Sequence, residues 1–171
     1  MPEDKSVETK WAREVLRAYY EKRDPVPPPG IDELDKQAAC FVTLHNADGS
    51  LRGCIGTILP VRKNLKKEIR ENAISAALRD PRFMPVEASE LESLEISVDV
   101  LGEPEPVNSV DELNPKVYGI IVSSCGRRGV LLPDLPGVTD VNVQIQIAMQ
   151  KAGIEPGTGI SVERFKVKRY Y

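Results

Sequence analysis

The hydrophobic residues of this chain repeat with the period of an α-helix in three segments, which predicts helices over residues 6–22, 64–78 and 140–152. A residue with a hydrogen-bonding side chain stands at the start of each segment, as expected of an N-cap: Ser6, Asn64, and Asp140 or its neighbour Thr139. Gly153 follows the third segment and favours a helix end there.

Other segments have the composition and alternation of β-strands, which predicts strands over 40–44, 51–59, 95–101, 118–123, 129–132 and 165–170. Turn-forming residues at 46–49 and at 125–128 join neighbouring strands into hairpins. In 95–101, Ile96, Val98 and Val100 alternate with polar residues, so this strand is expected to bury one face. No internal repeat is evident in the sequence.

Hairpins mixed with helices predict an α+β fold, mainly an antiparallel sheet with flanking helices. The length of 171 residues suits one compact domain over 1–171, with room for a small second lobe. We expect residues 1–5 to be a disordered tail and the proline-rich residues 24–30 to be a connector.

Composition narrows the classes of function. The formal net charge of −3 argues against a nucleic-acid-binding protein. The three cysteines are widely spaced, which suggests a reduced, cytoplasmic setting without a disulfide framework. A single histidine, His45, excludes a histidine-rich metal site within the chain. No metal ligands and no cofactor are evident from the sequence, which leaves open whether a metal binds. No apolar run is long enough for a membrane span.

The most unusual segment is Leu51–Thr57, with the sequence LRGCIGT, because it places two glycines three residues apart in a predicted strand. Such glycines mark a bulge or the close approach of a ligand or another backbone. If they leave backbone amides near Cys54 open, these form an anion-binding concavity. A thiol beside Arg52 could then be a nucleophile, while the alternative is a small buried cysteine.

The pairing of the first hairpin decides which residues surround Cys54. If Leu44 pairs with Leu51, Val42 and Ile55 share an apolar face, and the other face carries Thr43 and Cys54. His45 would then lie in the turn, about 10 Å or more from Cys54, which makes it a poor general base for that thiol.

A second candidate segment, Asp80-Pro81-Arg82-Phe83, follows the second predicted helix. An aspartate and an arginine on a rigid turn can orient an anionic substrate group. The alternative is an internal ion pair that ties the turn to the sheet.

These segments resemble the AMMECR-domain family, whose prokaryotic members are called AmmeMemoRadiSam system protein A. The resemblance covers residues 6–171. Besides LRGCIGT and DPRF it rests on FVTL at 41–44, EISVDVL at 95–101 followed by EPEP at 103–106, RRGVLLP at 127–133 and KAGI at 151–154. It implies an α+β fold and a site at LRGCIGT. It also implies a pathway shared with Memo-like and radical-SAM proteins, but no established reaction.

Two hypotheses follow. In the first, Cys54 is a nucleophile or thiolate, Arg52 and Asp80 assist it, and a small or peptidic ligand contacts the remaining residues of the site: Gly53, Ile55, Gly56, Thr57 and Arg82. In the second, the protein is a non-catalytic adaptor or ligand-binding protein and Cys54 is structural. The sequence leaves open whether the protein is an enzyme.

Overall fold

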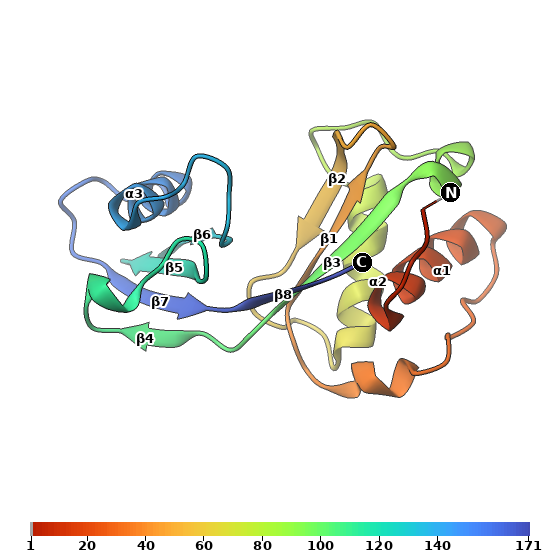
Figure 1. The fold of residues 1–171 in the computed structure, drawn as a ribbon, viewed down its shortest axis with the longest axis horizontal. Coiled ribbons are helices and arrows are strands. Elements are labelled where there is room, and N and C mark those ends of the chain that lie inside the picture. The colour runs from red at the N-terminus through yellow and green to blue at the C-terminus, as the bar shows by residue number, and fades with distance from the viewer. Residues whose placement is uncertain (1) are drawn as a thin grey trace. The chain divides into compact units, whose positions relative to one another are not determined.

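The computed structural model describes residues 2–171 and confirms the α+β class (Figure 1). The chain divides into two compact units, Met1–Val100 with Lys168–Tyr171, and Leu101–Val167. Each unit has an antiparallel sheet and a hydrophobic core of its own. None of the helices in residues 2–171 is long and apolar enough to cross a membrane.

The first unit contains a four-stranded sheet in the order β2-β1-β3-β8. Its helices and strands are α1 (Val7–Glu21), β1 (Cys40–His45), β2 (Leu51–Gly56), α2 (Leu65–Leu78), β3 (Glu95–Leu101) and β8 (Val167–Tyr170). Helix α2 packs on β1 and β2, and α1 packs on α2. Strand β2 is therefore an edge strand with one face against a helix.

The core of the first unit explains why these segments fold as they do. Val42, Leu44 and Val98 are completely buried on the face of the sheet that meets α2. Trp11 brings the apolar stripe of α1 to the same core, and its Nε1 donates to the carbonyl of Lys66 on α2 at 2.9 Å. A periodic apolar stripe thus docks each helix, as the sequence pattern indicates.

The hairpin of β1 and β2 has a different register from the one assumed, but the same faces. Leu44 pairs with Gly53 rather than Leu51, and a bulge at Leu44 and His45 absorbs the difference. The pairing is shifted by two residues, and side chains alternate between the two faces of a strand, so each residue keeps its face. Cys54 therefore lies beside Thr43 on the face opposite α2.

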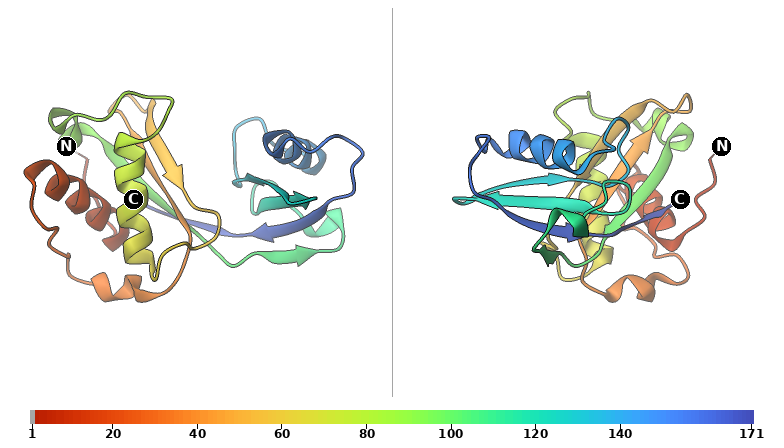
Figure 2. Two further views of the ribbon diagram at one scale, coloured as in Figure 1. Left: turned by 180° about the vertical axis from the view of Figure 1, so that it is seen from behind. Right: turned by 60° about the vertical axis from the view of Figure 1, so that its left-hand side comes forward.

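The second unit has a sheet in the order β4-β7-β5-β6, with α3 packed on β5 and β6 (Figure 2). Its helix and strands are β4 (Glu105–Val107), β5 (Gly119–Ser124), β6 (Arg127–Leu131), α3 (Val141–Ala152) and β7 (Ser161–Phe165). The predicted four-residue turn at 125–128 is wrong: only Cys125 and Gly126 form it, both with positive φ. The predicted strand over 165–170 is divided between β7 and β8, which belong to different sheets.

The two units share one topology, although no internal repeat is evident in the sequence. In the first, the β1–β2 hairpin is followed by α2 and β3, and in the second the β5–β6 hairpin is followed by α3 and β7. The strand orders β2-β1-β3 and β6-β5-β7 correspond. Gly53 and Gly129 occupy equivalent places, paired with Leu44 and Val122. Little sequence identity is needed for this, because both arrangements require mainly the same alternation of apolar positions.

The helix starts agree with the sequence analysis. The side chains of Ser6, Asn64 and Asp140 accept hydrogen bonds from backbone N–H groups of α1, α2 and α3 respectively. Gly153 ends α3 in the left-handed conformation, with φ of 68°. Short 3₁₀ helices at Ile31–Asp35, Ala88–Ser93 and Val110–Glu112 complete the list of helices.

Two local expectations differ from the structure. In the segment expected to be a disordered tail, Asp4 pairs with the nearly buried Arg13, and the N–H of Lys5 donates to the carbonyl of Tyr171 at 3.0 Å. Strand β3 was expected to expose one face, but Ser97 and Asp99 on that face are buried. Asp99 accepts two hydrogen bonds from Arg169 of β8, at 2.7 and 3.0 Å, which satisfies its charge.

Candidate functional site

The two glycines of LRGCIGT allow close packing rather than opening a cavity. A Cβ atom at Gly53 would lie less than 3.0 Å from the carbonyl oxygen of Ala76 on α2, so the absence of a side chain lets the helix approach β2. A Cβ atom at Gly56 would overlap the ring of Phe41 in the same way. These glycines therefore fix the position of the strand between its neighbours.

The Cys54 thiol lies half-buried on the face opposite α2. Its Sγ is 3.2 Å from the Oγ1 of Thr43, directly across the hairpin, and Thr43 in turn pairs with Ser97 of β3. Burial raises the pKa of the Cys54 thiol, and the Thr43 hydrogen bond and the charge of Arg82 offset this only in part. The thiol is accordingly held in its neutral form, which is the weaker nucleophile.

The backbone of Cys54 faces the open edge of the sheet, where the Asp80 segment occupies it. The Cys54 N–H donates to Oδ2 of Asp80 at 3.0 Å, and the Nη2 of Arg82 donates to the Cys54 carbonyl at 3.3 Å. The two side chains thus take the place of a neighbouring strand and cover the edge. This corrects the expectation of an open anion-binding concavity, because the amide already has an anionic partner.

Asp80 and Arg82 form a tight ion pair, with Nη2 2.7 Å from Oδ2 and Nε 3.0 Å from Oδ1. Asp80 is only 4% exposed, and it also accepts the N–H of Arg82. The hydrogen bonds from Arg82, together with the one from the Cys54 N–H, hold the pKa of this carboxyl well below its ordinary range. Asp80 is therefore ionised at neutral pH and serves as an acceptor, not as an acid.

Arg52 is engaged in fixing the following loop. Its Nε and Nη2 donate to the carboxylate of Glu90 at 2.9 and 3.1 Å, and its Nη1 and Nη2 donate to the carbonyls of Met84 and Pro85. Each nitrogen of the guanidinium thus already donates to a protein oxygen. In this arrangement Arg52 positions residues 84–90, and it neither approaches the Cys54 thiol as a partner nor offers a vacant donor fork to an anion.

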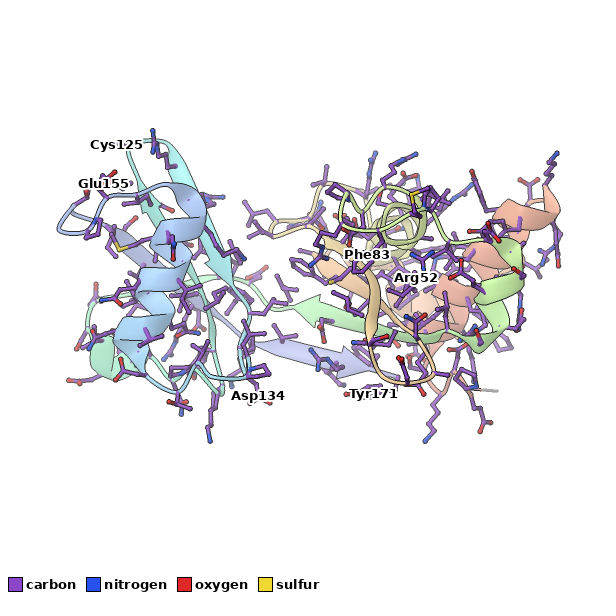
Figure 3. All side chains as sticks on the ribbon, turned by 90° about the horizontal axis from the view of Figure 1, so that it is seen from above. Arg52, Phe83, Cys125, Asp134, Glu155 and Tyr171 are labelled. Carbon is purple, nitrogen blue, oxygen red and sulfur yellow. The ribbon has the colours of Figure 1, made fainter. Side chains whose placement is uncertain are left out.

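Arg52 and Arg82 hold a loop, residues 80–86, that carries exposed apolar side chains. Figure 3 labels Phe83 of this loop, and Arg52. Met84 is 81% exposed and Phe83 is partly exposed. The Arg82 guanidinium carbon lies 5.5 Å from the centre of the Phe83 ring, and its side chain is 55% exposed. We call Arg82, Phe83 and Met84 the loop surface. It combines a cation, an aromatic ring and a thioether on a fixed backbone.

Ile55 and Thr57, the other two predicted ligand contacts, serve the interior of the first unit. Ile55 packs against the first core on the side of α2. The Thr57 hydroxyl donates to Oε1 of the buried Glu68 at 2.5 Å, while the same carboxylate accepts the backbone N–H groups of Val61 and Arg62.

Several residues around Cys54 were not predicted from the sequence. Ser97, Asp99 and Arg169 reach its neighbourhood through strand pairing, and Glu90 through its bonds to Arg52. The alternation in 95–101 placed Ser97 and Asp99 on one face, but only the strand order brings that face beside Cys54. No sequence signal connects residues 90 or 169 with residue 54.

The repeat of the fold gives an internal comparison for Cys54. Its equivalent in the second unit is Val130, which follows Gly129 as Cys54 follows Gly53. There too a side chain covers the edge strand, since the Nζ of Lys151 donates to the Val130 carbonyl at 2.9 Å. A hydrophobic residue thus fills this place in the same architecture. Within residues 2–171, no group of three or more histidine, cysteine or acidic residues could hold a metal ion.

Fold and site together define a two-unit α+β protein in which an Arg-Gly-Cys edge strand is covered by an Asp-Pro-Arg-Phe turn. The sequence model of the AMMECR1 family matches residues 9–171, and the chain belongs to this family. A protein of Thermotoga maritima is 50% identical over 165 residues, covering 94% of this chain and 95% of that protein.

Two further comparisons extend this result. A protein of Clostridium acetobutylicum is 43% identical over 98% of this chain, but the match spans only 36% of that longer protein. The crystal structure of the uncharacterized protein PH0010 from Pyrococcus horikoshii superimposes with a TM-score of 0.82 at 28% identity, covering 98% of this chain and 92% of that one. The fold is therefore shared over both units.

Proposed function

We propose that this protein is a non-catalytic binding component, an adaptor, and that the loop surface of Arg82, Phe83 and Met84 receives a protein partner. The observation that carries the proposal is that Met84 is almost fully exposed on a loop held by Arg52, Asp80 and Glu90. Arginine, methionine and aromatic side chains are enriched in the centres of protein interfaces. A fixed backbone also lowers the entropy lost on binding.

The chemistry around Cys54 supports the same proposal. Its thiol pKa is raised, its N–H and carbonyl are occupied by Asp80 and Arg82, and the residue equivalent to it in the repeat is Val130. The LRGCIG segment then serves as the platform that holds the loop surface in place.

The partners we propose are the Memo-like and radical-SAM proteins that the family's prokaryotic name implies. The length of the Clostridium relative fits a protein partner, because there this chain's counterpart is covalently joined to further polypeptide. Joining two binding modules raises their effective concentration, which is useful when the modules work on each other.

Binding to these partners is the first prediction. We expect the purified chain to bind one of the two partner proteins from the same genome, and Met84→Asp to weaken the complex at least ten-fold, because a carboxylate would be desolvated at the contact. Val110→Asp, at another exposed apolar residue, should bind as the unaltered protein does. Isothermal calorimetry measures the three affinities. If neither protein binds, the proposed partners are wrong. If Met84→Asp binds as tightly as Val110→Asp, the loop surface is not the contact.

A thiolate function at Cys54 is the second candidate, favoured by the partial exposure of Cys54 and by the charge of Arg82 nearby. We expect alkylation of Cys54 to follow an apparent pKa above the free-thiol value of about 8.5. The measurement uses a Cys125→Ser background, because Cys125 is exposed, whereas burial raises the pKa of Cys40 to about 12. Cys54→Ser in that background is the control for residual labelling. An apparent pKa below about 7.5 would establish a reactive thiolate at Cys54 and would exclude a purely structural role for this residue.

A further inference from the structure

The second unit contains a groove of about 820 Å³ that is separate from the LRGCIG segment. It follows one side of α3 from Asn142 to Gly153 and is closed by the loop 154–157. At a rise of 1.5 Å per residue, this stretch of helix is about 16 Å long. The groove is therefore elongated and has room for a linear occupant of about five extended residues.

The walls of the groove are amphipathic. Ile145, Met149 and Ile154 form an apolar floor. Asn142, Gln146 and Gln150 line it at intervals of four residues, and all three are exposed. The side chains of these three residues form no hydrogen bond with any other residue of 2–171. Their amide groups are therefore available as donors and acceptors.

The spacing of the three amides matches an extended peptide. Residues four apart on a helix are separated by about 6 Å along its axis. In an extended chain, alternate residues are separated by about 6.6 Å, and each such pair presents a peptide N–H and C=O on the same side. A row of carboxamides can thus pair with successive peptide groups, while alternate apolar side chains enter the floor.

The charge of the groove determines the orientation in which a peptide with a charged end would bind. No lysine or arginine lines it, and its one charged residue is Glu155, on the loop beside the C-terminal end of α3 (Figure 3). The carbonyl end of α3 lies at this end too, but the Nη1 of Arg127 already donates to the Gly153 carbonyl and offsets its negative potential. The selection therefore falls to Glu155, whose carboxylate takes part in none of the ion pairs of residues 2–171 and favours a positive group of the peptide over an acidic one.

We propose that this groove binds an extended peptide segment of another protein, apolar at alternate positions and positively charged at the end near Glu155. The amides of Asn142, Gln146 and Gln150 hold its backbone, and Ile145, Met149 and Ile154 receive its apolar side chains. This site is independent of the loop surface, so either can fail alone.

The test uses the full chain, labelled with ¹⁵N, and two synthetic peptides with amidated C-termini and acetylated N-termini, KVTVTV and EVTVTV. We expect KVTVTV to shift the amide signals of α3 and of loop 154–157, and EVTVTV to bind at least five-fold more weakly. Gln146→Ala with Gln150→Ala should weaken KVTVTV at least ten-fold. Alanine favours helix, so this double variant should stay folded. Asn108→Ala, at an exposed amide side chain outside the groove, should have no effect.

Glu155→Gln should abolish the preference for KVTVTV over EVTVTV. The variant with both Gln146→Ala and Gln150→Ala should instead weaken the binding of KVTVTV itself. The proposal is overturned if millimolar KVTVTV leaves the groove signals unchanged, or if the double variant binds it equally well. It is also overturned if acetyl-valine-amide binds as tightly as the hexapeptide, which would indicate a small-molecule pocket. Shifts that depend only on protein concentration would identify a second copy of this chain as the occupant and would likewise overturn it.

Discussion

Replacing Gly53 with alanine is expected to destabilise the protein by about 3 kcal/mol, the upper end of the usual cost of overpacking. The new Cβ atom would meet the backbone carbonyl of Ala76, which cannot turn away as a flexible side chain can. Helix α2 would have to move away from β2, and this movement would disturb the packing of Leu44 in the core. Urea denaturation followed by circular dichroism measures this loss.

Two other glycines make this prediction specific. Gly129→Ala should have a comparable effect in the second unit, because its Cβ atom would meet the carbonyl of Ala148. Gly159→Ala should change stability by less than about 0.5 kcal/mol, since no atom lies within 4 Å of its Cβ position. Equal stabilities of Gly53→Ala and Gly159→Ala would show that α2 does not depend on the glycine for its position.

Replacing Asp80 with alanine should destabilise the protein by about 2 kcal/mol at pH 7, because the Cys54 N–H loses its acceptor and Arg82 its partner. The exposure of Arg82 limits the cost, since water can solvate its released charge. We further expect faster amide exchange at Cys54, where the covered edge strand would be opened. Glu103→Gln, at an exposed carboxylate, is the matched control.

The effect of Asp80 also depends on pH in a defined direction. Its folded-state pKa lies below the unfolded value of about 3.9, so the unfolded chain binds its proton first as pH falls. The stabilisation by Asp80 is thus complete above about pH 5 and is lost progressively below pH 4. The stability difference between the unaltered protein and Asp80→Ala should therefore narrow between pH 5 and pH 3. A constant difference would mean that the carboxylate charge is not responsible.

The amphipathic patterns allowed much of the fold to be predicted. The three helices, their N-caps, the first hairpin and the strand at 95–101 were all identified from local alternation and capping residues. Strands β4 and β7 were missed, since β4 has only three residues and contains a proline, and β7 mixes charged and apolar residues. The joint between β7 and β8 was missed because a change of sheet leaves no mark on strand propensity.

At the candidate site, the sequence identified the segments that meet but not the contacts that each residue makes. LRGCIGT and DPRF do meet, through Asp80, Arg82 and Cys54. The expectation of open amides was wrong because a glycine tolerates a nearby backbone as readily as a ligand, and only the position of α2 distinguishes the two. Arg52 was paired with Cys54 by adjacency in sequence, whereas its guanidinium reaches a loop more than thirty residues further along the chain.

The sequence by itself determined the α+β class, the places of the helices and the faces of the first hairpin, because periodicity and caps act within a few residues of the chain. Tertiary structure alone decided that β2 is an edge strand, that Asp80 and Arg82 cover it, and that the thiol of Cys54 stays neutral. Those features depend on strand order and burial, which arise from contacts between residues distant in sequence. The repeated topology of the two units likewise becomes visible only in the tertiary structure, since distinct sequences with the same apolar alternation fold in the same way.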